Sequence, residues 1–248
     1  MKVMLINGSP KKKLGASKYI QKTIKLMLGS TETIECGMHT KNDIPKVLNE
    51  MEGIDAMVIA APLYVDGIPS HMIPFMKEAE AYCKAHGYHF PVYVLTNCGF
   101  IEGHQNALNL EQYECWTQRA GLTWGGGVGI GGGVVLLVYA IMLPIQIGLF
   151  LLNVVINLIS SMPPVSQGLL LALAENIGWF LFFSSSMFVC EGILSYRIKK
   201  QITGKNNLYA RFMIPAVLFL VAADIFMLVL SIIKGGFFKN VFHKETEI

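Results

Sequence analysis

The stretch MKVMLINGSPKKKLGAS, residues 1–17, decides how the first half of this chain folds. The apolar run Val3–Ile6 ends at the turn Asn7–Pro10, and a helical pattern begins near Ser17 after a lysine-rich loop. A buried strand, a Gly/Ser turn and a helix N-terminus in this order form an anion site, because backbone N–H groups and the helix dipole point at one place. The stretch therefore predicts a phosphate-binding loop at the start of an α/β domain.

Downstream of this loop, strand-like apolar runs alternate with helix-like patterns. Strands are expected at residues 3–6, 33–38, 55–61, 90–96 and 122–130, and helices at 17–28, 43–51, 70–86 and 103–120. Strict strand–helix alternation requires right-handed crossovers and gives a parallel sheet that is covered on both faces. The fold class predicted for residues 1–133 is therefore α/β, a doubly wound sheet of five parallel strands.

Two further loops should lie beside the phosphate-binding loop. Ligands of such sheets bind at the carboxyl ends of the strands, next to the switch in strand order. The loops that follow the third and fourth strands cover residues 62–70 and 97–104, and each contains glycine, an aromatic residue and an acid. We expect a flat heteroaromatic ring to find aromatic faces and exposed backbone amides between them.

The second half of the chain is far more apolar than the first. No Lys or Arg occurs from Ala120 to Tyr196, and apolar runs cover about 134–159, 169–194 and 214–233. The first run would extend about 39 Å as a helix, which is enough to cross a hydrocarbon core of about 30 Å. An α-helical membrane region at 134–248 is therefore expected. The alternative is a soluble protein with unusually apolar core helices, but a domain of this size buries three such runs with difficulty.

Charge and cysteine content indicate where the chain resides. The apolar stretch at the N-terminus is too short for a secretory signal, and the five cysteines form no C-x-x-C pair, as is typical of reduced thiols. Residues 197–211 carry five basic side chains and are expected to be cytoplasmic by the positive-inside rule. We therefore expect the chain at the cytoplasmic membrane, with membrane lipid as a partner and its first domain in the cytoplasm. The formal net charge of +3 gives no indication of nucleic acid binding.

The motifs NGSP, PLYVDGIPSHMI, NCGF and GLTWGGGVGIGGG, together with Ser17, resemble those of the flavodoxin-like NAD(P)H-dependent FMN reductases in order and spacing. The resemblance covers about residues 1–133. It implies a flavodoxin-like fold, an FMN whose phosphate lies in the Gly8–Ser17 loop and an isoalloxazine ring that packs against the Pro62–Gly67 loop. It also implies NAD(P)H as co-substrate and a homodimer.

The resemblance implies a set of cofactor-binding positions, which are Ser9, Pro10, Lys11, Ser17, Pro62, Leu63, Tyr64, Val65, Asp66, Gly67, Asn97, Cys98, Gly99 and Phe100. Ser9 and Ser17 would hydrogen-bond phosphate oxygens, although both could also be simple turn and cap residues. Backbone near Asp66 would reach flavin N5. Tyr64 would flank the ring or lie in the core, and Cys98 is expected to be a small buried residue and not a redox thiol. No side chain is predicted to be catalytic, because flavin carries the chemistry, and no metal ligands are predicted.

The chain departs from the family pattern after Gly133, where soluble relatives continue into a final helix that covers the sheet. Two arrangements fit. Residues 134–159 cross the membrane and 169–194 return, which is slightly favoured. Otherwise 134–159 form a re-entrant hairpin bent near Pro144 and Gly148, and 169–177 provide the closing helix.

Three further features of the sequence bear on its function. The run Gly127–Gly132 matches G-x-G-x-x-G, but it belongs to a strand and has no acid about 20 residues later, so a dinucleotide fingerprint is rejected. Glu191 and Asp224 fall within apolar runs, where an acid is a functional candidate. Glu191 is expected to snorkel near a helix end or to pair between helices, with Arg197 one to two turns away as a neighbour, and Asp224 is given no role.

The predicted function is an FMN-dependent NAD(P)H oxidoreductase at the cytoplasmic membrane. It would pass a hydride from the nicotinamide to FMN and electrons onward to a small acceptor such as a quinone or free flavin. The alternative is a non-enzymatic membrane sensor or assembly module that binds FMN or another nucleotide. A hydrolase that uses Ser9 is disfavoured, since no Ser-His-acid order and no nucleophile elbow is present.

Overall fold

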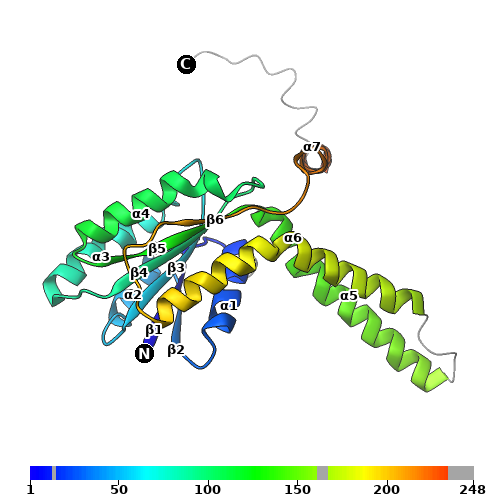
Figure 1. Cartoon of the computed structure of the whole chain (residues 1–248), viewed down its shortest axis with the longest axis horizontal. Helices are drawn as coiled ribbons and strands as arrows, with labels where there is room; N and C mark the ends of the chain where they lie inside the picture. Colours follow the sequence, from blue (N-terminus) through cyan, green and yellow to red (C-terminus); the bar gives the residue numbers. More distant parts are fainter. Residues whose placement is uncertain (13–14, 161–166, 234–248) are drawn as a thin grey trace, which may run out of the picture. The chain divides into compact units, whose positions relative to one another are not determined.

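A computed structural model describes residues 1–12, 15–160 and 167–233 of the chain (Figure 1). The chain divides into two compact units, Met1–Met213 and Ile214–Ile248. Within the second unit the structure describes one apolar helix, α7 (Ala216–Ile233), on which Asp224 is exposed.

A parallel sheet of six strands forms the centre of the first unit. The strands are β1 (Lys2–Asn7), β2 (Glu32–Gly37), β3 (Ala56–Pro62), β4 (Pro91–Asn97), β5 (Thr123–Ile130) and β6 (Leu208–Ala210). They lie in the order β2-β1-β3-β4-β5-β6, which is the flavodoxin-like order with one strand added at the edge. The sequence AMVIAAP of β3 is buried throughout, because both faces of a parallel sheet are covered.

The sixth strand corrects the prediction of a five-stranded sheet. β6 pairs with β5 in parallel, with Val128 opposite Leu208 and Ile130 opposite Ala210. It has only three residues and follows a polar segment, so it carries no alternating pattern that sequence analysis could detect. β5, β6 and the turn at Gly103 lie close together. A Cβ at Gly103 would lie 2.3 Å from the Gly129 oxygen and 2.5 Å from that of Ala210, so a larger residue would not fit there.

Helices cover the two faces of the sheet. They are α1 (Ala16–Leu28), α2 (Ile44–Asn49), α3 (Met72–His86) and α4 (Ala107–Arg119), with short 3₁₀ turns at Lys41–Asp43 and Gly103–Asn106. α3 packs against α2 and α4 over one face, while α1 packs against the sheet on the other face (Figure 1). The expected helix at 103–120 is therefore a 3₁₀ turn followed by α4.

The second half of α6 (Gln167–Lys199) shares the α1 face and closes the sheet. Its buried residues recur at helical spacing and include Ser184, Met187, Glu191, Leu194 and Ile198. The alternative in which residues 169–177 form the closing helix is wrong, because Leu170 and Leu171 are 54% and 61% exposed. Those residues form the first half of the same helix, which does not reach the sheet.

Glu191 makes its contact with α1 and not with Arg197. Thr23 Oγ1 lies 2.9 Å from a Glu191 carboxylate oxygen, and the Glu191 side chain is fully buried. Arg197 Nη1 donates instead to the Asn206 carbonyl oxygen at 3.0 Å. The expected pairing between helices is therefore found, and the pairing with Arg197 is not.

α5 (Gly133–Ser160) and the first half of α6 form an apolar hairpin that extends from the sheet. We define it as the part of α5 after Tyr139 and the part of α6 before Phe180. The rings of these two residues lie 5.1 Å apart at its base. α5 continues unbroken through Pro144, so the bend near Pro144 and Gly148 that the re-entrant alternative requires is not found. Among the described residues, two helical segments are long and apolar enough to cross a membrane, Gly133–Ile159 and Gly168–Lys199.

Candidate functional site

A cavity of about 150 Å³ lies at the carboxyl ends of β1, β3 and β4. It is lined by Ser9, Lys11, Gly15, Ala16, Ser17, Pro62, Leu63, Tyr64, Asn97, Cys98, Gly99, Gly133, Val134 and Leu137. β1 and β3 are the neighbours at which the strand order reverses, and ligands of open α/β sheets bind at such a point. The cavity is therefore where a cofactor of this fold would be expected.

Most predicted site positions come together at this cavity. Those that line it are Ser9, Lys11, Ser17, Pro62, Leu63, Tyr64, Asn97, Cys98 and Gly99. Pro10, Val65, Asp66, Gly67 and Phe100 do not line it, although they belong to the same three loops. Lys12 is exposed, and Lys13 lies outside the described residues.

The two predicted phosphate-binding serines differ in their contacts. Ser17 Oγ donates to Asn97 Oδ1 at 2.8 Å, which ties the start of α1 to the end of β4. Ser9 Oγ accepts a hydrogen bond from the Lys11 backbone N–H at 3.3 Å, which leaves its own hydrogen to donate. Both serines are buried. Ser9 is therefore the better placed of the two to donate to an anion.

The N-terminus of α1 adds backbone donors to this place. Gly15 is the N-cap residue and is extended, and a Cβ there would lie 3.3 Å from Ser9 Oγ. The first N–H groups of a helix have no partner within the helix, and the helix dipole adds positive potential. A small oxyanion at this end of the cavity would meet these amides together with the Ser9 hydroxyl.

Two histidines that sequence analysis did not single out brace the loop from behind. His39 Nδ1 donates to the Ser9 carbonyl oxygen at 2.6 Å. His71 Nε2 lies 3.1 Å from the carbonyl oxygens of both Gly8 and Met38. A carbonyl oxygen only accepts, so these ring nitrogens carry hydrogen. Burial lowers the pKa of His71, which favours its neutral form. These contacts join residues far apart in sequence, so local patterns do not reveal them. The one sequence indication was that His71 lies within the motif PLYVDGIPSHMI.

The loop after β3 forms a tight, exposed turn. Tyr64 and Gly67 exchange two backbone hydrogen bonds of 3.1 Å, with Val65 and Asp66 at the tip. Both tip residues have positive φ, 48° and 56°, which is unusual for a β-branched side chain such as Val65. Tyr64 is 43% exposed, so the alternative that it is a core residue is wrong. Its ring is free to contact a ligand.

The loop after β4 supplies the opposite side. Cys98 is buried, and burial raises the pKa of its thiol, as expected for a small buried residue and not a redox thiol. Phe100 is 59% exposed. A Cβ at Gly99 would lie 3.7 Å from Val134, so this loop passes close to the start of α5.

The first turn of α5 completes the cavity. Gly133, Val134 and Leu137 line it, and the Gly133 N–H donates to the Cys98 carbonyl oxygen at 2.8 Å. A Cβ at Gly133 would lie 2.7 Å from Asn97 Nδ2, so a larger residue would displace the helix. Sequence analysis ended the first domain at residue 133 and therefore assigned no site role to this wall.

The residues present fit an FMN whose phosphate end is enclosed and whose ring is open. Cavities that enclose whole ligands measure roughly 300–1,000 Å³, and this one measures about 150 Å³. It therefore accommodates only the polar tail, in the cradle that Gly15 leaves beside Ser9. The isoalloxazine ring would lie between the Tyr64 turn and the Phe100 loop, where both aromatic side chains are exposed.

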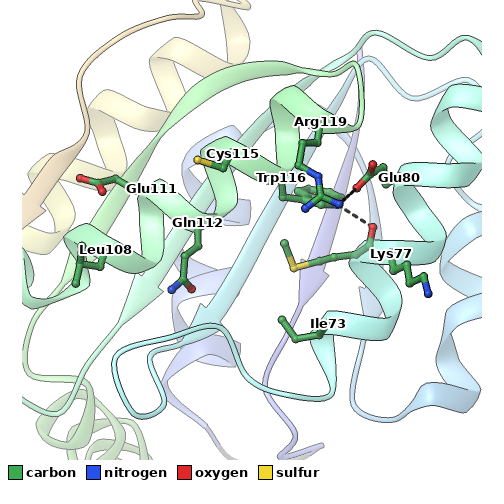
Figure 2. Close-up of a pocket in the computed structure, with 10 residues that line it drawn as sticks. Ile73, Lys77, Glu80, Leu108, Glu111, Gln112, Cys115, Trp116 and Arg119 are labelled. Atoms are coloured by element: carbon green, nitrogen blue, oxygen red, sulfur yellow. Dashed lines mark hydrogen bonds and ion pairs between the residues drawn. The ribbon is translucent and has the colours of Figure 1, made fainter.

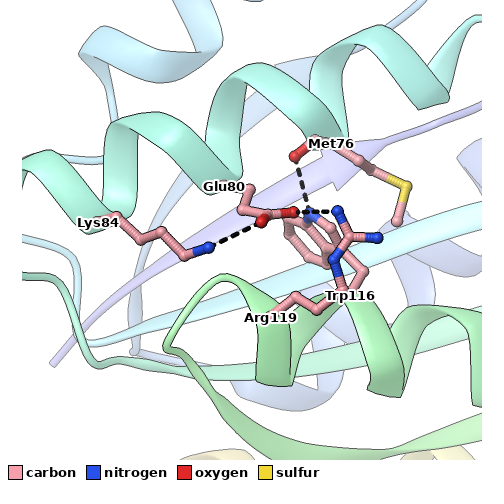
Figure 3. A network of polar contacts seen from close by, with 5 residues as sticks. All are labelled: Met76, Glu80, Lys84, Trp116 and Arg119. Carbon is pink, nitrogen blue, oxygen red and sulfur yellow. Dashed lines mark hydrogen bonds and ion pairs between the residues drawn. The ribbon is translucent and has the colours of Figure 1, made fainter.

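A larger groove of about 650 Å³ lies between α3 and α4 (Figure 2). It contains none of the predicted site residues, and two of its charged side chains, Glu80 and Arg119, form an ion pair. Glu80 accepts hydrogen bonds from Lys84 at 2.8 Å and Arg119 at 2.9 Å, and Trp116 Nε1 donates to the Met76 carbonyl oxygen at 2.8 Å (Figure 3). The Lys84 hydrogen bond lowers the pKa of Glu80. These pairs indicate packing between helices.

Comparison with known proteins gives fold relatives only. No family model and no curated protein sequence matches the chain. Similar solved structures include an NADPH-quinone reductase from P. pentosaceus, at 12% identity and a TM-score of 0.45, with 56% of this chain and 94% of that one covered. They also include the Trp repressor binding protein of Bacillus subtilis, at 15% identity, a TM-score of 0.43 and the same coverage.

An azoreductase from Bacillus anthracis str. Sterne is similar at 13% identity and a TM-score of 0.41, with 56% and 91% of the two chains covered. These neighbours are flavodoxin-like proteins. Similarity at this level carries no argument about activity, so the assignment of the fold rests on the strand order itself.

Proposed function

We propose that this chain is a flavin-dependent NAD(P)H oxidoreductase that uses FMN and is attached to the cytoplasmic face of a membrane by its apolar hairpin. The observation that carries the proposal is the meeting of three loops at the switch point of a flavodoxin-like sheet. One loop offers an oxyanion the Ser9 hydroxyl and the amides at the start of α1. The other two offer exposed aromatic side chains, Tyr64 and Phe100, to a flat ring.

In this proposal the protein binds and orients the cofactor, and it excludes water from the phosphate end. When bound, FMN supplies the chemistry: it accepts a hydride from NAD(P)H and, with one proton from solvent, two electrons and two protons reach an acceptor such as a quinone or free flavin. Ser9 would hold the phosphate, and His39 and His71 would keep the loop in its binding conformation. Lys11 lines the cavity and adds positive charge.

Membrane attachment is proposed from the hairpin. Large apolar side chains along both of its legs are exposed, Leu151, Leu152, Leu170 and Leu171 among them. Contiguous apolar surface of this extent marks a membrane or protein contact. The length and composition of the α5 leg suit a membrane better than a protein partner, because no charged side chain occurs between Tyr139 and Ser160. The α6 leg carries one charged side chain, the exposed Glu175.

The test is flavin binding by the full chain purified in detergent. Ser9→Ala should raise the dissociation constant for FMN about 10–100-fold, because a hydrogen bond to a charged group contributes about 1.5–3 kcal/mol. Ser17→Ala should have a smaller effect, since Asn97 already takes its hydroxyl hydrogen. Ser70→Ala is the matched control, because Ser70 is exposed and does not line the cavity.

The same preparation separates the enzyme from the alternative function. A non-enzymatic FMN-binding sensor or assembly module would gain the flavin spectrum without oxidising NADH or NADPH. A chain that stays colourless after incubation with FMN would contradict both functions.

A further inference from the structure

The apolar segments of the first unit meet the sheet at the edge that holds the cofactor cavity. α5 begins at Gly133, hydrogen-bonded to Cys98 after β4. α6 passes the same edge at Phe183, whose carbonyl oxygen accepts from the Met213 N–H at 3.0 Å. Met213 is the last residue of the unit and directly precedes the apolar segment that contains α7. The apolar segments of the chain therefore connect to the first unit at the carboxyl edge of its sheet.

The same edge exposes apolar side chains on the loops themselves. Val65 is completely exposed and Phe100 is 59% exposed. Val65 also has a φ of 48°, a conformation that destabilises a β-branched residue. Solvent exposure and backbone strain both disfavour valine at this position in a water-facing turn. A turn that contacts an apolar medium would offset them.

An apolar stripe joins the cavity to the hairpin. Val134 lines the cavity, and Val138, Met142 and Ile145 follow it along one side of α5. Each of the four is between 44% and 50% exposed. Their spacing of three to four residues keeps them on one face of the helix.

The length of the α5 leg indicates where the carboxyl edge of the sheet would lie relative to the bilayer. The α5 leg from Tyr139 to Ser160 is about 33 Å long at about 1.5 Å per residue, which matches a hydrocarbon core of about 30 Å. Tyr139 and the exposed Trp179 lie at its base, and Tyr and Trp side chains favour the membrane interface. Val134 precedes Tyr139 by about 7–8 Å along the helix, so the cavity wall would lie at the depth of the lipid headgroups.

We propose that the carboxyl edge of the sheet rests on the lipid surface, with Val65 and Phe100 among the headgroups, so that the cavity opens toward the bilayer. A compound dissolved in the lipid would then reach the cavity along the α5 stripe without crossing water. The inference rests on the hairpin attachment of the proposed function, and it does not depend on which cofactor the cavity holds.

Site-directed fluorescence in the full chain tests this orientation. A Cys115→Ser background removes the exposed native thiol, and the other four cysteines are buried. Val65→Cys and, as the control, Ser30→Cys are labelled with an environment-sensitive fluorophore and reconstituted in phosphatidylcholine–phosphatidylglycerol nanodiscs. Ser30 is exposed in the turn between α1 and β2, at the opposite edge of the sheet. Nitroxide-labelled lipids should quench the label at position 65 several-fold more than the label at position 30.

The outcomes separate this inference from the proposed function. Equal quenching at positions 65 and 30 in chains that do reside in nanodiscs would overturn the orientation and leave the attachment intact. Chains that remain outside the nanodiscs would overturn the attachment and, with it, the orientation. Flavin absorbance is recorded on the same samples, so a failure to bind FMN is detected independently. If Val65→Cys does not fold, Phe100→Cys provides the second probe on the same edge.

Discussion

The two halves of α6 are one unbroken helix with two different surroundings. In the second half, residues at a spacing of three to four, such as Leu194 and Ile198, are fully buried against the sheet unit. In the first half, Leu170 and Leu171 are exposed although they are equally apolar. Hydropathy does not distinguish the two halves, because both are apolar. Only the second half has buried side chains that recur every three to four residues, and this spacing identifies it as the part that packs against the sheet.

The α6 leg of the hairpin and the helix that covers the sheet are one continuous helix. Lys199 Nζ donates to the Met27 carbonyl oxygen at 2.7 Å, which fixes the far end of α6 to α1. At the other end, Phe180 packs against Tyr19 and Tyr139. The position of the hairpin is therefore coupled to the helix whose N-terminus lines the cavity.

The largest expected effect comes from removing the hairpin. A chain that ends at Met213, with residues 140–179 replaced by a short glycine–serine linker, should move from the membrane fraction to the soluble fraction. A short linker is sufficient, because the rings of Tyr139 and Phe180 are only 5.1 Å apart. The remaining half of α6 should still cover the sheet, so circular dichroism should show cooperative thermal unfolding.

The control is the same truncation at Met213 with the hairpin kept, which should remain with the membranes. If the hairpin-free chain still requires detergent, the difference between the two halves of α6 does not account for membrane attachment.

A single substitution in each half tests the comparison directly. Leu194→Ala should lower the free energy of unfolding by about 2–5 kcal/mol, because it leaves a cavity beneath a fully buried side chain. Leu171→Ala, in the exposed half, should change it by less than about 0.5 kcal/mol. Both are measured by thermal unfolding of the full chain in detergent. Equal losses would show that the exposed half is packed in the isolated protein.

Much of the sheet could be predicted from the sequence, because buried parallel strands are short apolar runs bounded by turn residues. The loops after β1, β3 and β4 meet as predicted, since the carboxyl ends of parallel strands lie at one edge. Binding of a cofactor by these residues remains a prediction.

The elements that sequence analysis missed depend on tertiary contacts. β6 exists only because β5 offers an edge to pair with. The apolar run at 169–194 spans both halves of α6, so hydropathy merged a hairpin leg with a closing helix. His39 and His71 act on carbonyl oxygens of a loop more than 29 residues away in the chain, a contact that local patterns do not reveal.

A smaller effect is expected at the strained turn. Val65→Gly should raise the free energy of unfolding by up to about 1 kcal/mol, because relief of about 1–2 kcal/mol of left-handed strain exceeds the entropy that glycine adds to the unfolded chain. Val65→Ala keeps a Cβ at positive φ and should show less gain. Denaturation in detergent compares the three chains. A loss of stability in Val65→Gly would mean that the valine side chain packs within the unit.

The smallest effect is the pH dependence set by His71, and it belongs wholly to the sheet unit. Burial lowers the pKa of His71 below its ordinary value of 6.5, so between these two pKa values the unfolded chain binds more protons than the folded chain. The stability that His71 contributes is thus complete above pH 6.5 and is lost as the pH falls through the lowered pKa. His71→Gln should flatten the decline in unfolding free energy over this range, whereas His89→Gln, at an exposed position, should leave it unchanged. The contacts of His71 are to Gly8 and Met38, so the same difference should persist when the hairpin is removed. A pH dependence that disappears with the hairpin would show that the two regions are not energetically separate.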